Sequence, residues 1–134
     1  PDEGLMAHSK EWCEAWRLPQ MRHGVATIYG WVPYYPENIK FGRFVDIGWG
    51  TFLQARHGIE IGDHVEVGPN CAILSENSED MTHCKIIIKR NVMIGANCVI
   101  LPRKDGKPLV IGRNARIKAG TIVTKSIPDN FRYP

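Results

Sequence analysis

A six-residue period dominates the sequence from about residue 35 onward. In the stretch IGDHVEVGPNCAIL, aliphatic residues recur at Ile61, Val67 and Ile73, and Val65 and Cys71 follow the first two by four places. This period matches neither the α-helix, with about 3.6 residues per turn, nor the two-residue alternation of a strand. The same aliphatic position recurs at Phe41, Ile47, Leu53, Ile61, Val67, Ile73, Ile88, Ile94, Ile100, Ile111, Ile117 and Val123.

Such a period indicates a β-solenoid. A repeat that cannot bury its apolar side alone becomes stable when copies of it stack. Three short strands joined by sharp corners make one turn of a triangular prism, and stacked turns pair as parallel strands about 4.8 Å apart. We count the recurring aliphatic residue as the first place of each six-residue repeat. Its side chain points inward, and the residue at the fifth place must be small because it fills a vertex. Glycine follows the first place, where we expect it to permit the corner conformation, at Gly42, Gly48, Gly62, Gly68, Gly95 and Gly112.

The stacking register makes a further prediction about the cysteines. If the coils stack in register, Thr51, Cys71, Cys98 and Thr121 form one column along a vertex. Cys71 and Cys98 should then be buried neighbours that act as small hydrophobic residues. An antiparallel sandwich is disfavoured, because it would alternate every two residues and would show no column of glycines.

The chain divides into two parts. Residues 31–134 carry the repeats, and residues 1–30 form an N-terminal helical or extended segment. In that segment, LMAHSKEWCEAWRL has a partial helical stripe that includes Leu5 and Met6, and it predicts one short helix that Pro19 ends. A chain of 134 residues is long enough to bury a core without disulfides or metals.

Composition excludes several classes of function. The net charge of +3 comes without a continuous basic run, so it suits an anionic small ligand and does not indicate nucleic-acid binding. The four cysteines match no zinc pattern and are expected to be free thiols. No apolar run approaches the roughly 18 residues of a membrane span, and no signal peptide is evident, so we expect a cytoplasmic protein.

Three stretches carry a family resemblance. IGDHVEVGPNCAI, VMIGANCVIL and IGRNARIKAGTIVTKSIPDN resemble the repeats of hexapeptide-repeat acyltransferases, over roughly residues 38–130. The resemblance implies an all-β fold, a left-handed parallel β-helix shaped as a triangular prism of about four to five coils, with a short N-terminal helix. The chain departs from the family pattern in an insertion at 103–109, and at Lys118, where glycine is common.

The resemblance also implies an activity. Members, including sugar or galactoside O-acetyltransferases, transfer an acetyl group from acetyl-CoA to a hydroxyl or amine of a sugar or sugar-derived acceptor. We therefore expect this reaction, with cell-surface polysaccharide biosynthesis as one context, and no metal. The resemblance implies a homotrimer with active sites between subunits. Aromatic residues expected to point outward agree with such an assembly, namely Phe44, Trp49 and Phe52.

Two histidines are the candidate catalytic residues, because acetyl transfer needs a general base and imidazole suits that role near neutral pH. His57 occupies a fifth place, and His83 lies in the longest break, SENSEDMTHCK. We expect one to be the base, with His83 favoured, and the other to orient the acceptor. His64 is interpreted as an outward residue on a flat side, and His8 and His23 as surface or partner contacts.

Residues near these breaks are the candidate acceptor ligands, namely Gln54, Asn77 and Glu76. For acetyl-CoA, the family resemblance implies backbone groups of the closing coils and a basic residue near the end. The matching positions are Gly95, Lys118, Ala119, Gly120 and Lys125.

The sequence also permits two other functions. One is a non-catalytic trimeric scaffold on the same fold. The less favoured one is a zinc-dependent enzyme of the carbonic-anhydrase type, which would need three histidines to converge on one metal across a subunit interface. His57, His64 and His83 are numerous enough, although His64 is expected on a different side of the prism.

Overall fold

The computed structural model describes residues 8–134. Helix α1 (Lys10–Ala15) begins after Ser9, whose hydroxyl accepts a hydrogen bond from the backbone N–H of Trp12 at 3.1 Å. The predicted short helix is therefore confirmed, but it ends at Ala15 with Trp16 already extended, and not at Pro19 as expected. Leu5 and Met6 of its expected stripe lie outside the described residues. No helix within residues 8–134 has the length and apolar character that crossing a bilayer requires.

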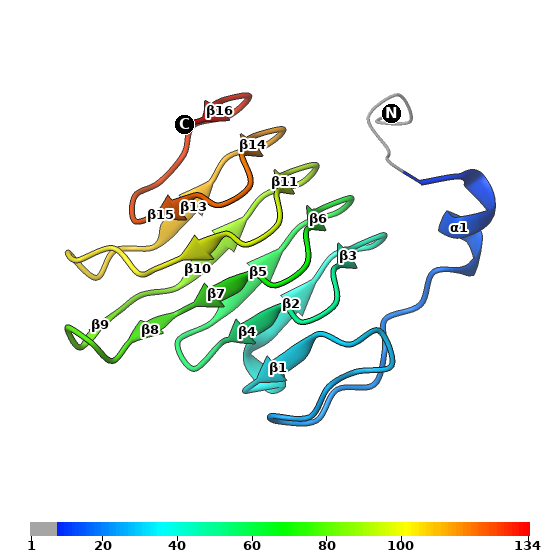
Figure 1. The fold of residues 1–134 in the computed structure, drawn as a ribbon, viewed down its shortest axis with the longest axis horizontal. Coiled ribbons are helices and arrows are strands. Elements are labelled where there is room, and N and C mark those ends of the chain that lie inside the picture. Colours follow the sequence, from blue (N-terminus) through cyan, green and yellow to red (C-terminus); the bar gives the residue numbers. More distant parts are fainter. Residues whose placement is uncertain (1–7) are drawn as a thin grey trace.

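Three parallel sheets form the sides of a prism (Figure 1), and we name each by its first strand. The β1 sheet contains, in spatial order, β1 (Val32–Tyr34), β4 (Phe52–Gln54), β7 (Ala72–Leu74), β12 (Val99–Ile100) and β15 (Ile122–Val123). The β2 sheet contains β2 (Ile39–Phe41), β5 (Ile59–Ile61), β10 (Ile86–Ile88) and β13 (Leu109–Ile111). The β3 sheet contains β3 (Asp46–Ile47), β6 (Glu66–Val67), β11 (Met93–Ile94), β14 (Arg116–Ile117) and β16 (Arg132–Tyr133).

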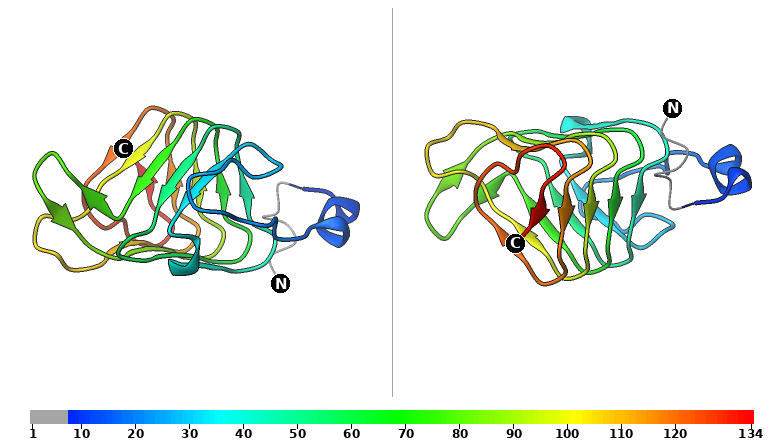
Figure 2. Two further views of the ribbon diagram at one scale, coloured as in Figure 1. Left: turned by 90° about the horizontal axis from the view of Figure 1, so that it is seen from below. Right: turned by 90° about the horizontal axis from the view of Figure 1, so that it is seen from above.

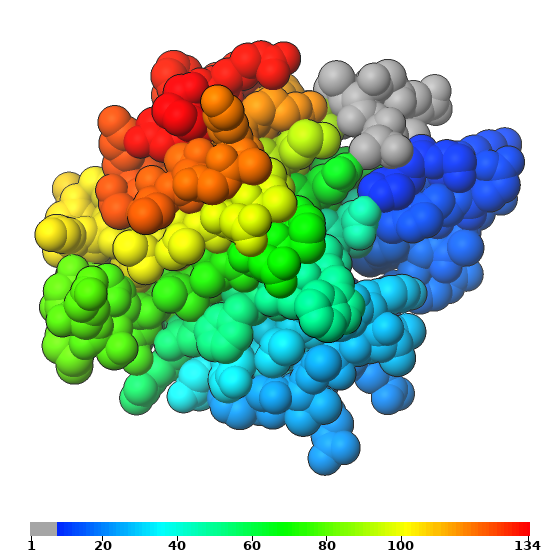
Figure 3. All heavy atoms as spheres, in the orientation of Figure 1, coloured from blue at the N-terminus to red at the C-terminus, as the bar shows by residue number. Residues whose placement is uncertain are grey.

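The stacking register follows the six-residue pattern. Phe41, Ile61, Ile88 and Ile111 pair in one row across the β2 sheet, and the other two sheets show equivalent rows. The first-place side chains are buried, except that of Phe41, which is half-buried and packs against Trp31. The predicted parallel β-helix of the all-β class, with one short helix, is confirmed. In the space-filling view (Figure 3), the N-terminal arm, residues 8–30, lies against the side of the first coils.

The predicted cysteine column is also confirmed. Cys71 and Cys98 precede the paired residues Ala72 and Val99, and both side chains are buried. The Cys71 thiol donates to the carbonyl oxygen of Gly95 at 3.1 Å. Burial raises the pKa of Cys71 above its usual value, so this residue remains a thiol at neutral pH.

The glycines of the second place serve a different purpose from the one expected. They do not have positive φ angles. Instead, a Cβ at Gly68 or Gly95 would lie 2.6 Å from a backbone nitrogen of the next coil. Only glycine lets neighbouring coils approach this closely at the second place.

The corner conformation belongs to the fourth place. At the vertex between the β2 and β3 sheets, Phe44, His64, Asn91 and Asn114 all have φ near +60°. Asparagine tolerates this left-handed conformation better than most residues. His64 is therefore a vertex residue, half-buried with its ring stacked on Phe44 at 4.9 Å, rather than an outward residue on a flat side.

The vertex between the β1 and β2 sheets is irregular, and we call it the site vertex. The chain crosses it at 55–58, 75–85, 101–108 and 124–126, and in the first coil through the 3₁₀ helix η2 (Pro36–Asn38). The fifth-place residues His57, Asn77 and Lys104 do not fill the interior here; Ala55 and Ser75 are buried instead. The second crossing is a hairpin of β8 (Glu76–Asn77) and β9 (Thr82–His83), and it lies beside the loop 101–108 (Figure 2).

Candidate active site

The two candidate histidines lie together at the site vertex. The rings of His57 and His83 are stacked, with their centroids 4.3 Å apart and their planes 17° apart. His57 follows strand β4, and His83 ends strand β9 of the hairpin. Since one chain alone brings the two imidazoles into contact, both can belong to one site.

Glu76 completes this cluster. Its Oε1 lies 2.9 Å from Nε2 of His57, and it pairs directly with His83 across the β8–β9 hairpin. The pKa of Glu76 is lowered, first by the hydrogen bond to His57 and then by the charges of Arg56 and the two histidines. Glu76 is therefore an ionised hydrogen-bond acceptor at neutral pH. The role of Arg56, 3.7 Å from Glu76, was not foreseen, since a lone arginine in a turn carries no sequence signal.

A buried hydroxyl holds the His57 backbone. Ser75 accepts a hydrogen bond from the His57 N–H at 3.0 Å and donates its own proton to Oε1 of Gln54 at 2.8 Å. That oxygen also accepts from the Arg56 N–H at 3.2 Å. Because the Gln54 side-chain oxygen has these two partners, only the amide nitrogen of Gln54 remains to bind an acceptor substrate. Ser75 has no exposed surface, so its role is to position the turn.

The other predicted acceptor ligand shapes the hairpin. Asn77 accepts a hydrogen bond from the backbone N–H of Glu79 at 3.1 Å and so closes the turn beyond β8. Asp80 does the same for Thr82, at 3.1 Å from its N–H and 2.6 Å from its hydroxyl. Asn77 and Asp80 therefore brace the strand that presents His83.

The remaining histidines lie elsewhere. The ring of His23 accepts a hydrogen bond from the Tyr35 N–H at 2.9 Å and packs edge-on against Tyr34 and Tyr35. His64 stands at the vertex between the β2 and β3 sheets, away from the site vertex. Within one chain, the three histidines of a carbonic-anhydrase-like site therefore do not converge.

The predicted acetyl-CoA residues form two groups. Lys118, Ala119 and Gly120 are exposed in the turn between β14 and β15, and Gly95 lies beneath Ala119 in the preceding coil. Lys125 instead follows β15 at the site vertex, where its ammonium lies 5.6 Å from the centre of the Tyr133 ring. The two groups thus lie at opposite ends of the strands of the β1 sheet.

The comparisons with known proteins agree with this architecture. A family model described as "Hexapeptide repeat of succinyl-transferase" matches residues 85–125. A galactoside O-acetyltransferase of Lactococcus lactis subsp. lactis (strain IL1403) is 33% identical over 111 residues, which cover 73% of this chain and 51% of that protein. One from Escherichia coli (strain K12) is 35% identical over 106 residues, covering 72% and 49%. The chain therefore carries hexapeptide repeats and is similar to acetyltransferases that share them.

A second kind of relative shares the repeats. The bifunctional protein GlmU of Listeria monocytogenes serotype 4a (strain HCC23) is 33% identical over 103 residues, which cover 70% of this chain and 21% of that protein. The chain spans about half the length of the galactoside O-acetyltransferases that it matches. No solved structure gives a significant match.

The insertion at 103–109, by which the chain departs from the family pattern, adjoins the candidate site. Asp105 braces this loop, accepting from the Arg103 guanidinium at 2.5 Å and from the Lys107 N–H at 3.0 Å. A Cβ at Gly106 would lie 3.9 Å from the carbonyl oxygen of His83. The inserted loop therefore forms one wall beside the His83 hairpin.

Proposed function

We propose that this protein transfers an acetyl group from acetyl-CoA to a hydroxyl, or an amine, of a sugar or sugar-derived acceptor. Its hexapeptide repeats and its similarity to two galactoside O-acetyltransferases support this reaction class. The observation that carries the proposal is the bond between His57 and Glu76, 2.9 Å long, at a vertex where the chain leaves the prism. An imidazole oriented by a carboxylate is an arrangement suited to general-base chemistry.

The bond to Glu76 assigns a role to each ring nitrogen of His57. When Nε2–H donates to the ionised carboxylate, Nδ1 has no proton and accepts one. In the proposed reaction, Nδ1 takes the proton of the acceptor hydroxyl as its oxygen attacks the thioester carbonyl. The carbon–sulfur bond then breaks, and the proton passes to the departing thiolate of coenzyme A. Glu76 stabilises the imidazolium between these steps.

His83 is proposed to orient the acceptor. His83 is exposed, and its ring makes no hydrogen bond with the residues that the structure describes. The ring nitrogens are therefore available to a hydroxyl of the acceptor. This assignment reverses the order expected from the sequence, where His83 was favoured as the base. The reason is that the Glu76 carboxylate shares a hydrogen bond with the His57 ring, whereas the His83 ring has none among the described residues.

A homotrimer would complete the acetyl-CoA site. The outer face of the β1 sheet carries a row of uncharged side chains, Phe52, Ala72, Val99 and Ile122. The corresponding rows of the other two sheets contain charged residues, such as Glu60 and Glu66. A second copy packed on the β1 sheet would cover this apolar face and bring Lys118 of one chain toward the site vertex of another. Lys118 and Lys125 would then serve as point charges for the phosphates of coenzyme A.

The test is product analysis by mass spectrometry. The protein, in a cytoplasmic-type reducing buffer, is incubated with acetyl-CoA and a panel of sugars, nucleotide sugars and serine. We expect a sugar to gain one acetyl group. Coenzyme A should also raise the melting temperature, because a ligand that binds only the folded state stabilises it. No product and no thermal shift would overturn the proposal in favour of the non-catalytic scaffold.

A further inference from the structure

A second group of ligating side chains lies on the outer face of the β3 sheet, away from the site vertex. It consists of His8 from the N-terminal arm, Asp46 from β3 and Glu66 from β6. One ligand atom from each residue lies within 4.8 Å of the other two. Nε2 of His8 is 2.7 Å from Oδ2 of Asp46. The acetyl-transfer site described above uses none of these residues.

The charges in this group are not balanced. Asp46 and Glu66 pair in register on adjacent strands and point to the same face, an arrangement in which like charges repel. The Glu66 carboxylate makes no hydrogen bond or ion pair with any residue from 8 to 134 that the structure describes. Among residues 8–134, the His8 imidazole is the group that forms an ion pair with Asp46.

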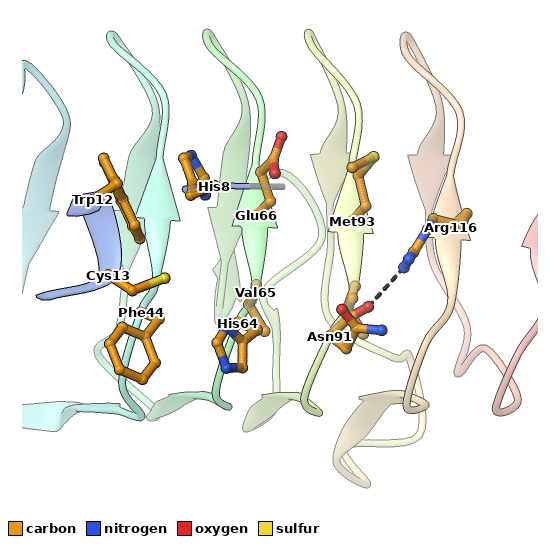
Figure 4. Close-up of a pocket in the computed structure, with 11 residues that line it drawn as sticks. His8, Trp12, Cys13, Phe44, His64, Val65, Glu66, Asn91, Met93 and Arg116 are labelled. Atoms are coloured by element: carbon orange, nitrogen blue, oxygen red, sulfur yellow. Dashed lines mark hydrogen bonds between the residues drawn. The ribbon is translucent and has the colours of Figure 1, made fainter. Parts of the chain in front are cut away.

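Arg116, the nearest cation in the row of Glu66, does not compensate the charge of the two carboxylates. Met93 follows Glu66 in the row, and Arg116 follows Met93. Figure 4 shows the Arg116 guanidinium turned toward Asn91, to whose carbonyl oxygen it donates at 2.6 Å. No lysine or arginine from residue 8 to 134 therefore forms an ion pair with either carboxylate.

Two members of the group, His8 and Glu66, border a hollow of suitable size, whereas Asp46 does not line it. A cavity of about 20 Å³ is lined by His8, Glu66, Met93 and neighbouring residues (Figure 4). Roughly 10–15 Å³ of such volume is enough for one water-sized particle. Trp12, stacked on His8 with ring centroids 3.8 Å apart, forms one side and keeps the imidazole turned toward the carboxylates.

We propose that His8, Asp46 and Glu66 bind one divalent cation of the zinc type. One imidazole nitrogen and two carboxylate oxygens form a ligand set that suits zinc, with a water as the fourth ligand. The cation replaces the proton between His8 and Asp46 and neutralises the Asp46–Glu66 pair. Small side-chain shifts bring the three atoms to the bond lengths of about 2.0–2.2 Å that zinc requires.

This cation joins the N-terminal arm to the β-helix. His8 immediately precedes Ser9, the N-cap of α1, while Asp46 and Glu66 stand on adjacent coils. The role is therefore structural. The proposed cation departs from the sequence-based expectation of no metal. That expectation concerned the candidate catalytic histidines and did not include this group.

The test is zinc binding to tag-free protein after chelator treatment, by calorimetry and thermal shift. Wild type is expected to bind one Zn²⁺ per chain and to melt at a higher temperature with it. His8→Gln and Glu66→Gln should each weaken binding by about tenfold or more, since each removes a ligand. The matched control is Glu60→Gln, whose carboxylate lies on the β2 sheet and pairs with Lys85, and it should bind like wild type.

A second variant excludes the other histidine cluster. His57→Ala/His83→Ala should still bind Zn²⁺ like wild type, and circular dichroism checks that each variant is folded. The proposal is overturned if wild type does not bind zinc at millimolar concentration. It is equally overturned if Glu66→Gln binds as tightly as wild type, or if only the His57→Ala/His83→Ala variant loses binding.

Discussion

At the scale of single residues, the contacts of His57 separate it from His83. His57 is held through its backbone by Ser75 and through its ring by Glu76, whereas the ring of His83 contacts the cluster by stacking alone. A base works only if its orientation is fixed before the reaction, because proton transfer depends on short hydrogen-bond distances. The difference in contacts therefore leads to different expectations for the two variants.

We predict that His57→Ala lowers kcat by about 10²–10⁴-fold. His83→Ala should mainly raise the KM for the acceptor, because an orienting residue contributes to binding. The measurement is steady-state acetyl transfer with each variant. The control is His64→Asn, which retains the left-handed vertex conformation that Asn91 and Asn114 adopt in the next coils. Wild-type rates in both histidine variants would show that the assignment is wrong.

A second residue-scale prediction concerns Glu60. The hydrogen bond from Lys85 is the main cause that lowers the pKa of Glu60 in the folded state. A lowered folded pKa contributes stability above the unfolded value of about 4.3, and this contribution is lost as the pH falls through the folded pKa.

Glu60→Gln should therefore destabilise the protein at pH 7, by at most about 1 kcal/mol because the pair is partly exposed. At pH 3 the variant and wild type should differ less. Urea unfolding midpoints at the two pH values provide the measurement. A difference that grows toward pH 3 would contradict the assigned role of the Glu60–Lys85 pair.

At the scale of the coil, the close approach of successive backbones limits which substitutions the repeats accept. A Cβ at Gly68 would lie 2.6 Å from the Ala96 nitrogen, whereas a Cβ at Gly120 would meet no atom within 4 Å. Gly120 has a φ of +76°, and Asn70 and Asn97 hold the equivalent place in earlier coils with φ near +60°. Gly68 is therefore required by the close approach of the next coil, whereas the place of Gly120 needs only a residue that tolerates a positive φ.

We predict that Gly68→Ala destabilises the protein by about 1–3 kcal/mol, the usual cost of overpacking. Gly120→Asn should change stability by less than about 0.5 kcal/mol, as at other surface positions without special contacts. Urea denaturation followed by circular dichroism compares the two. Equal midpoints for Gly68→Ala and wild type would mean that the coils separate without cost at this corner.

At the scale of the whole molecule, the outer face of the β1 sheet distinguishes one side of the prism from the other two. Ile122 on this face is 61% exposed, and Trp49 at its edge is 70% exposed. Large exposed apolar side chains gathered on one face are typical of an interaction surface. Phe44, in contrast, is half-buried beneath Trp16 of the N-terminal arm, so it adds little to this surface.

Ile122→Lys should therefore dissociate the proposed trimer and abolish acetyl transfer, since a buried lysine without a partner is costly. The control is Ile87→Lys on the outer face of the β2 sheet, which should leave both properties unchanged. Light scattering gives the mass directly. A wild-type mass of one chain, 15.1 kDa, would contradict the trimer at once.

The period alone determined the fold and most of the core. Each first-place residue needs a partner of its own kind in the next coil, so a six-residue spacing already specifies which residues stack. The rows from Phe41 to Ile111 and the contact between Cys71 and Cys98 follow from that counting. The predicted role of the second-place glycines was wrong. A sequence shows which places are glycine, but it does not show how closely two coils approach.

Only the tertiary structure decided the candidate sites. His57, Glu76 and His83 leave the repeat pattern, and no period relates residues that leave it, so their contacts depend on how the hairpin folds back. The zinc-type group had one sequence signal, acidic residues at the same place of two successive coils, Asp46 and Glu66. Its third member, His8, arrives from an arm outside the repeats. Regular stacking can be counted along a chain, whereas contacts between segments outside the repeat depend on distances that exist only after folding.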